Sequence, residues 1–336
     1  MTLIELMVAV ALSLLVVGLG IFAMMGASVS LRNVSGTTST TDSSMLLTTV
    51  MQRAVNQAGF QPAEQAKRKF TREAYYEAYP SGYPGKPYPD IFGFSNYKFN
   101  GMPTDPTAGD FQKFYTSVTS GGLPIVAGGN NDVLALRFQA VPERLDEAGG
   151  ITAMVDLCSG NMLATNPYFN YGNDDLVAEI YKPLFVFSVA PGGMDAPDAK
   201  GDVLFCDAYI EAAADETGVR GSLRQRTAIM DGIVAFKVLY GVPDAGASVW
   251  KDASAMVPAD WYKVKRVRIG FILQSTVDNA GGIAKNGETV TLYPLGEQFS
   301  DKSAVTKTYE ESVVYRVVNF TVDVNNGLIP SNLDAI

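Results

Sequence analysis

The first 31 residues constrain this chain most, because a long uncharged segment follows a single acidic residue there. Glu5 is charged, and no residue from Leu6 to Leu31 carries a charge. As a helix, this segment would extend about 39 Å, which is enough to cross the roughly 30 Å hydrocarbon core of a bilayer. A secretory signal peptide fits poorly, since its apolar region is shorter and basic residues precede it. We therefore predict a hydrophobic, membrane-inserting helix over residues 1–31.

Glu5 is the exceptional residue of this segment. A carboxylate at the edge of a hydrophobic helix costs several kcal/mol if it enters lipid without a partner. Its side chain can reach the lipid headgroups instead, or it can pair with a positive group that is buried with it. The nearest candidate is an N-terminal amine, on the same chain or on a neighbouring one. Position alone leaves these alternatives open.

Composition argues against several classes of function. The formal net charge of -9 disfavours a nucleic-acid partner, which would need a basic face. The chain has no histidine, so it lacks the usual general base near neutral pH and the commonest metal ligand. It also lacks GxSxG, P-loop, HExxH and CxxC motifs. We therefore predict that the protein is not an enzyme and holds no cofactor and no metal.

The helix is expected to continue past the apolar segment, as an amphipathic part over residues 32–60. Apolar residues recur there with helical spacing, and Gly59 followed by Pro62 marks the end. The stretch SGTTSTT, residues 35–41, has poor helix propensity. It is interpreted as a frayed turn or a break between two helical parts.

Residues 61–336 are predicted to form one β-rich globular domain. Apolar and polar residues alternate in several segments, which is typical of half-buried antiparallel strands, and long loops between them argue against a parallel sheet. The fold class is therefore α+β, a long N-terminal helix with a mainly antiparallel sheet and large loops. The predicted strands cover 132–139, 203–209, 232–240, 264–274 and 312–324.

A segment rich in tyrosine, proline and glycine, residues 75–115, interrupts this domain. Such a density of proline and glycine opposes a long helix or a central strand, so we expect a long structured loop. Its aromatic rings either cover their own domain or contact a neighbour, since exposed tyrosines favour interfaces. Tyr79, Tyr83 and Tyr88 are the candidate interface residues.

The two cysteines, Cys158 and Cys206, are the only ones in the chain. An even, low count in an exported protein favours one disulfide over two buried thiols. Loop-closure entropy would give such a bond roughly 4 kcal/mol of stabilisation.

The N-terminal sequence MTLIELMVAVALSLLVVGLG resembles the mature N-terminus of type IV pilins and pseudopilins. The resemblance implies that a prepilin peptidase cuts after a glycine, that Met1 is the first mature residue and is N-methylated, and that Glu5 neutralises the amine of a neighbouring Met1 during filament assembly. The usual first residue is phenylalanine, so Met1 departs from the pattern. Phe22 replaces a proline common in the family, and Gly18 and Gly20 either supply flexibility there or serve close helix packing.

Later segments are similar to the PilW group of minor pilins. They are QAGFQP, GGNNDVLALRF, DLCSGN, GIVAFKVLYGV, WYKVKRVRIGFILQS and VYRVVNFTVDVNN, in that order. This resemblance implies a pilin-like fold and a minor pilin that primes assembly or sits near the filament tip. The alternatives are a major pilin and a large pseudopilin of type II secretion. A membrane-anchored enzyme or binding domain is the alternative from another class.

The resemblance also implies partners and locations. The partners are other pilin subunits, the assembly machinery, the prepilin peptidase and, before assembly, the membrane. We expect a single-pass protein of the bacterial inner membrane that later enters an extracellular filament.

Overall fold

The computed structural model describes a helix and a set of strands within the 336-residue chain. The described residues are 3–59, 90–99, 125–127, 131–137, 142–145, 151–155, 158, 162–164, 184–214, 220–244, 247–257, 260–275, 287–308 and 313–324. They combine one long helix with a mainly antiparallel sheet, so the predicted α+β class is confirmed.

The main sheet has eight strands, and every strand pair within it is antiparallel. Seven strands follow one another across the sheet in the order β1-β4-β8-β9-β10-β12-β15, and β11 pairs with β10 outside that order. Their bounds are β1 Ile91–Phe94, β4 Val133–Arg137, β8 Leu184–Pro191, β9 Asp202–Ala214, β10 Arg220–Asp244, β11 Ala247–Lys251, β12 Arg266–Gln274 and β15 Tyr315–Asp323.

Strand β10 joins the two halves of this sheet, because its 25 residues pair with different strands along their length. Residues 220–233 pair with β9, residues 233–241 with β12, and residues 240–244 with β11. A glycine with positive φ, Gly232, lies at the changeover (φ 72°), where both registers shift. A left-handed backbone conformation is open to glycine at no steric cost, so the long strand can bend here.

Smaller elements surround the main sheet. The minor sheets pair β2 Tyr97–Phe99 with β3 Ile125–Ala127, β5 Pro142–Leu145 with β6 Ile151–Val155, β6 with β7 Met162–Ala164, and β13 Thr289–Leu292 with β14 Val305–Thr308. The short helices are η1 Gly193–Asp195, η2 Ala253–Ala255, η3 Trp261–Lys263, η4 Glu297–Phe299 and α5 Ser300–Ser303.

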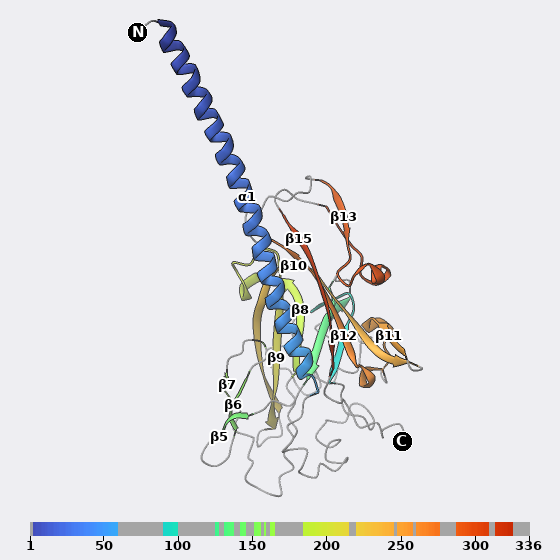
Figure 1. Ribbon diagram of the computed structural model, residues 1–336. Coiled ribbons are helices and arrows are strands. Elements are labelled where there is room, and N and C mark those ends of the chain that lie inside the picture. The colour runs from blue at the N-terminus through green and yellow to red at the C-terminus, as the bar shows by residue number, and fades with distance from the viewer. Residues whose placement is uncertain are drawn as a thin grey trace.

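Helix α1, Leu3–Gln57, is the longest element, with 55 residues and a length of about 80 Å. Figure 1 shows its N-terminal half projecting away from the sheet, while its C-terminal part lies alongside the strands. That part contacts β15, β12 and β10. The helix ends where Gly59 takes a positive φ of 73° and its N–H donates to the carbonyl of Arg137, 2.8 Å away.

The core lies between the C-terminal part of α1 and one face of the sheet. Leu47, Met51 and Val55 are fully buried there, one or two helical turns apart. They join a cluster of strand residues that includes Phe236 and Phe271, whose rings stack with centroids 4.8 Å apart. Burial of such side chains from water is the main stabilising contribution to a domain of this kind.

The five predicted strands are confirmed as β4, β9, β10, β12 and β15, with shifts at their ends. The predicted end of the helix at Gly59 is confirmed as well. Two expectations were wrong. Residues 35–41 form no break, because α1 runs through them. The segment 75–115, expected to be a loop, contains the buried strand β1 and strand β2, and its residues outside 90–99 lie beyond the described part.

Candidate assembly helix and a buried polar cluster

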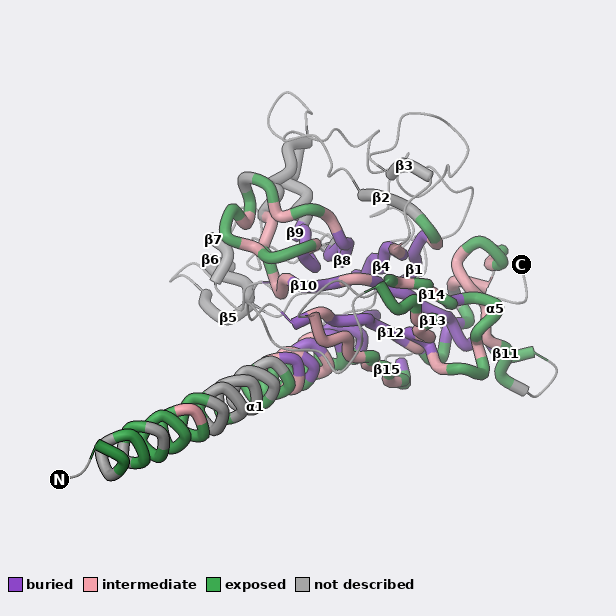
Figure 2. Tube along the Cα trace, turned by 90° about the horizontal axis from the view of Figure 1, so that it is seen from above, coloured by how far each residue is buried: buried purple, intermediate pink, exposed green. Residues whose placement is uncertain are grey.

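The projecting half of α1 presents large apolar side chains to its surroundings. Leu3 is 80% exposed and Met24 is 78% exposed. Figure 2 shows this half as exposed and the part beside the sheet as buried. The other exposed large apolar side chains of this half are Ile4, Met7, Val8, Val10, Leu12, Leu14, Leu15, Val16, Val17, Leu19 and Ile21.

These side chains surround the helix and do not form a single stripe. Leu14, Leu15, Val16 and Val17 are consecutive, and consecutive residues in a helix point about 100° apart. A helix that is apolar on all sides belongs in an apolar environment, such as a helical bundle or a bilayer. Within the described ranges, no helix meets the length and apolarity required of a membrane span.

The change from exposed to buried occurs near Thr40. From there, one face of α1 is buried against the sheet, and the hydroxyls of Thr40, Thr41 and Ser44 donate to carbonyls three or four residues earlier. These bonds satisfy the hydroxyls within the helix, which explains why a Ser/Thr-rich stretch stays helical. Arg316 of β15 also donates from Nη1 to Thr41 Oγ1 over 2.7 Å, so the sheet contacts the helix at this point.

The predicted site residues of the N-terminal segment are only partly described. Glu5 lies in α1, but its side chain is outside the described part, as are Met1 and the tyrosines Tyr79, Tyr83 and Tyr88. Gly18 and Gly20 lie within the projecting half of α1. A Cβ atom added at either position would meet no described atom within 4 Å, so packing within this chain does not require glycine there.

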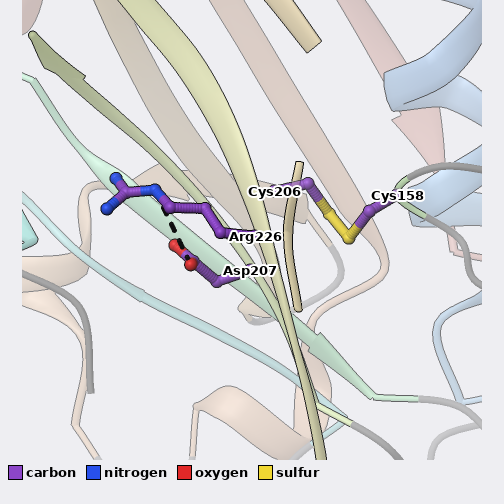
Figure 3. The surroundings of a disulfide bond; sticks show 4 residues. All are labelled: Cys158, Cys206, Asp207 and Arg226. Atoms are coloured by element: carbon purple, nitrogen blue, oxygen red, sulfur yellow. Dashed lines mark ion pairs between the residues drawn. A yellow bond between two sulfur atoms is a disulfide. The ribbon is translucent and has the colours of Figure 1, made fainter. Parts of the chain in front are cut away.

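A disulfide joins Cys158 to Cys206 of β9, and both cysteines are buried in the main core (Figure 3). It is the pairing that the sequence led us to expect. The bond attaches the segment between β6 and β7 to the middle of the main sheet. Two segments that lie 48 residues apart in sequence are thereby held together.

Next to Cys206, Asp207 points to the other face of β9, toward Arg226 of β10 (Figure 3). The Nε atom of Arg226 lies 3.8 Å from Asp207 Oδ1, and its guanidinium lies 4.0 Å from the centroid of the Phe205 ring. Nη1 of Arg226 lies 3.5 Å from Oδ2 of Asp195 in η1. Sequence reasoning did not identify this ion pair.

A second polar cluster lies where β4 begins, beside residues 236–238 of β10. Asp132 is 4% exposed and Lys237 of β10 is 7% exposed, and Lys237 Nζ lies 3.4 Å from Asp132 Oδ1. Asp132 also accepts backbone hydrogen bonds from Asn96 (3.0 Å) and Val238 (2.8 Å). Lys237 Nζ donates a further hydrogen bond to Asn96 Oδ1.

These bonds let the chain around Asp132 act as a partner for the edge of β10 that faces away from β12, where β9 no longer pairs with it. The N–H of Asp132 donates to the carbonyl of Phe236 over 2.8 Å, and Oδ1 of Asn131 accepts from the N–H of Phe236, also over 2.8 Å. Buried backbone groups that lack a partner cost free energy, so side chains here supply partners that a strand would otherwise supply.

Burial raises the pKa of the Asp132 carboxyl above its ordinary value, although the Lys237 charge and the hydrogen bonds oppose that rise. Tyr240 lies nearby and is fully buried, and its hydroxyl has no hydrogen-bond partner among the described atoms. Burial, together with the negative charge of Asp132, raises the pKa of Tyr240 well above its ordinary value. The hydroxyl packs so close to Gly93 that no Cβ fits at that position.

The Asn96 and Lys237 side chains open on a hollow of about 360 Å³. Its opposite wall is formed by the segment from Ser300 to Lys307, which carries α5 and β14. Over the described part of the chain, no group of three or more Cys, Asp or Glu side chains is placed to hold a metal ion. The chemistry available at this position is therefore that of an amine, an amide and a carboxyl.

Comparisons with known proteins add family information. The family model of Type IV Pilus-assembly protein W (PilW) matches residues 198–326. The type IV-like pilin TTHA1219 from Thermus thermophilus is similar at 15% sequence identity, over 60% of this chain and 82% of that chain, with a TM-score of 0.30. A TM-score this low carries no argument. The search of curated proteins found no match.

The matched residues extend from just before β9 to just after β15. They include three of the segments from which the resemblance was inferred, GIVAFKVLYGV, WYKVKRVRIGFILQS and VYRVVNFTVDVNN. Residues 198–326 therefore carry the sequence pattern of the PilW family of type IV pilus-assembly proteins.

Proposed function

We propose that this chain is a subunit of a type IV pilus-like filament and enters the filament through the projecting half of α1. The observation that carries the proposal is the exposed apolar surface on all sides of that half, on a helix whose other end is fixed to a folded sheet. Moving that surface from water into a bundle of neighbouring helices would stabilise the assembly through apolar burial, and helices that come from lipid would gain close packing against one another.

We assign different roles to three consecutive parts of the chain. Residues 1–31 form the hydrophobic helix of the membrane and the filament core, and residues 32–60 form its amphipathic continuation. Residues 61–336 form the globular pilin domain with the Tyr/Pro/Gly-rich insert. Before assembly, the chain sits in the bacterial inner membrane by the first segment and faces out of the cytoplasm.

Glu5 is proposed to set how one subunit docks against its neighbour in the filament. Its carboxylate pairs with the N-methylated amine of Met1 on a neighbouring subunit, in the apolar interior of the filament. Pairing offsets the desolvation of both charges, whereas one charge left alone there would cost several kcal/mol. The glycines at 18 and 20 let the helix bend as it packs, since glycine destabilises a helix by about 1 kcal/mol relative to alanine.

The PilW match favours a minor pilin that primes assembly or sits near the tip. A major pilin and a large pseudopilin of type II secretion share the same N-terminal mechanism and differ in abundance and in the filament that they enter. The tyrosines at 79, 83 and 88 are proposed contacts to neighbouring subunits or to an adhesion target.

The test is to shear filaments from the native host and quantify this chain by mass spectrometry, including its N-terminal peptide. We expect a trace subunit that begins with N-methylated Met1. A chain that dominates the filament would make it a major pilin. A chain that is present in cells and absent from all filaments would overturn the proposal.

A matched pair of variants tests the mechanism. Glu5→Leu removes the proposed partner of the amine and should lower the amount of this chain in filaments at least tenfold, while its level in the membrane is unchanged. Asp42→Asn removes an exposed acid from the packed half of the same helix and should leave that amount unchanged. Equal incorporation of both variants would contradict the role of Glu5.

A further inference from the structure

Three reactive groups meet at the polar cluster of β4 and β10. They are the amine of Lys237, the side-chain amide of Asn96 in the turn between β1 and β2, and the carboxyl of Asp132 just before β4. An ion pair alone would need only the lysine and the aspartate. Here the amine also donates to the oxygen of a carboxamide, which places Nζ next to the carbonyl carbon that carries this oxygen.

We propose that Nζ of Lys237 forms an amide bond with the side-chain carbonyl carbon of Asn96, so that an isopeptide cross-link joins β10 to the β1–β2 turn. This inference concerns the folded domain and stands whether or not the chain enters a filament.

The reaction needs no further reactant. Lys237 gives a proton to Asp132, and the neutral Nζ attacks the carbonyl carbon of Asn96. A proton then moves from Nζ to the side-chain nitrogen of Asn96, directly or through Asp132. The bond between that nitrogen and the carbonyl carbon breaks, and ammonia leaves with the proton held by Asp132. One C–N bond forms, one breaks, and no atom is oxidised or reduced.

The surroundings favour the first step. Lys237 and Asp132 are both more than nine-tenths buried, so little water competes with the contact between their side chains. Burial also raises the pKa of Asp132, so the carboxyl is a better acceptor for the lysine proton than an exposed aspartate would be. A neutral amine in place of an ammonium is what nucleophilic attack by lysine requires.

The position of the electrophile is fixed by its backbone. The N–H of Asn96 donates to Asp132 Oδ1, the same oxygen that faces Lys237 Nζ, so one carboxyl orients both reacting residues. Asn96 has a φ of 59°, and no other non-glycine residue in the described part has a positive φ. Holding the reacting groups in contact supplies much of the rate of an intramolecular reaction.

The hollow beside the cluster gives the leaving group a path. Asn96 and Lys237 both line it, so ammonia released at Asn96 can reach solvent without crossing the core. The product would join positions 141 residues apart and would fix the strand at one edge of the main sheet, β1, to β10 near its centre.

The experiment is intact-mass spectrometry of the full chain, purified in detergent with its disulfide oxidised. The sequence mass is taken here with the disulfide formed, which removes two hydrogens, and with the methyl group that the N-terminal peptide shows on Met1. We expect the wild-type mass to fall short of this sequence mass by one ammonia, and proteolysis to yield a branched peptide that contains both Asn96 and Lys237. Lys237→Arg keeps the positive charge beside Asp132 and should show its full sequence mass. Asp132→Asn removes the proton acceptor and should also show its full sequence mass.

Lys251→Arg is the matched control, because Lys251 pairs with Asp260 over 2.8 Å without a reactive amide in the described contacts. It should show the same loss of ammonia as the wild type. A wild-type chain with its full sequence mass would overturn the proposal. So would loss of ammonia in Lys237→Arg, since the loss would then come from cyclisation of an asparagine. A cross-link in Asp132→Asn would overturn the role of the carboxyl.

Discussion

The two halves of α1 have the same secondary structure and opposite surroundings. The N-terminal half is apolar on all sides and exposed, whereas the C-terminal half mixes polar and apolar residues and buries one face against the sheet. Local hydrogen bonds maintain the helix in both halves, including the Ser/Thr-rich stretch between them. The projecting half is helical without contacts to the sheet, whereas the Ser/Thr-rich stretch also packs against the domain, so the sheet supports the helix at that end and fixes its position. The packed half fixes the helix to the domain and leaves the other half free for partners.

The largest effect that distinguishes the halves is expected from leucine truncation. Leu47 is fully buried, so Leu47→Ala should lower the free energy of unfolding by about 2–5 kcal/mol. Leu15 is exposed, and Leu15→Ala should change it by less than about 0.5 kcal/mol. Guanidinium unfolding of the detergent-solubilised chain, followed by tryptophan fluorescence, measures both. Similar losses for the two variants would contradict the division of the helix.

A fall in pH should lower the stability of the packed domain. The projecting half should not respond, because it has no charged residue from Leu6 to Leu31. Asp252, the N-cap of η2, accepts hydrogen bonds from Ser254 and from the N–H of Ala255, and its carboxylate lies 3.6 Å from Lys302 Nζ. Partial burial alone would raise its pKa, but these hydrogen bonds and the Lys302 charge lower the pKa below 3.8 overall.

Because the pKa of Asp252 is lower in the folded state, its contribution to stability is present above pH 3.8 and is lost as the pH falls through the folded-state pKa. Asp252→Ala should lower the free energy of unfolding by about 1 kcal/mol at pH 7 and flatten its decline in acid. Unfolding curves between pH 7 and pH 3 test this. An unchanged pH profile in the variant would argue against the role of Asp252.

The smallest effect is expected from loss of the hydrogen bond between β15 and α1, near the boundary between the two halves. Thr41→Val removes the acceptor of Arg316 Nη1 and should cost about 0.5–1 kcal/mol. Thr49→Val is the control, because the hydroxyl of Thr49 bonds only to the carbonyl of Met45 in its own helix and is exposed. Its cost should be near zero. If the two variants unfold alike, the contact between β15 and the helix contributes nothing measurable.

Sequence patterns predicted those strands in which the order of apolar and polar residues indicates which side chains are buried. Alternation predicted β4, β10, β12 and β15, since the sequence displays an apolar period in each of them. Strand β9 was predicted over residues 203–209 without such a period. Strand β8, Leu184–Pro191, was missed because its run LFVFSVAP is buried on both faces and shows no clear alternation. Strand β1 was missed because the proline and glycine around it indicated a loop.

The interpretation of residues 35–41 failed for a different reason. Propensity scales penalise serine and threonine in helices, but here their hydroxyls bond to carbonyls of the preceding turn, and Thr40 and Ser44 are buried against the domain. Tertiary packing therefore overrides a weak local preference. A sequence gives no sign of such packing before the partner surface is known.

The polar cluster could not have been predicted from sequence. Asp132 and Lys237 are 105 residues apart, Asn96 and Lys237 are 141 apart, and no motif connects them. The start of β4 reaches β10 only because β9 stops pairing with β10 at Ile233, which leaves Phe236 to bond with Asn131 and Asp132. By contrast, the exposed apolar half of α1 was evident from the absence of charge alone, because that signal is contained in one continuous segment.

The contact between the two ends of the chain has a consequence for biosynthesis. Thr41 and Arg316 are 275 residues apart, and the face of α1 that carries Leu47 and Met51 packs in a core that includes Val322. A ribosome makes α1 well before β15. The buried face of α1 therefore cannot complete its packing until β15 has emerged. Such contacts between distant parts of a chain slow folding, because a long loop has to close before they form.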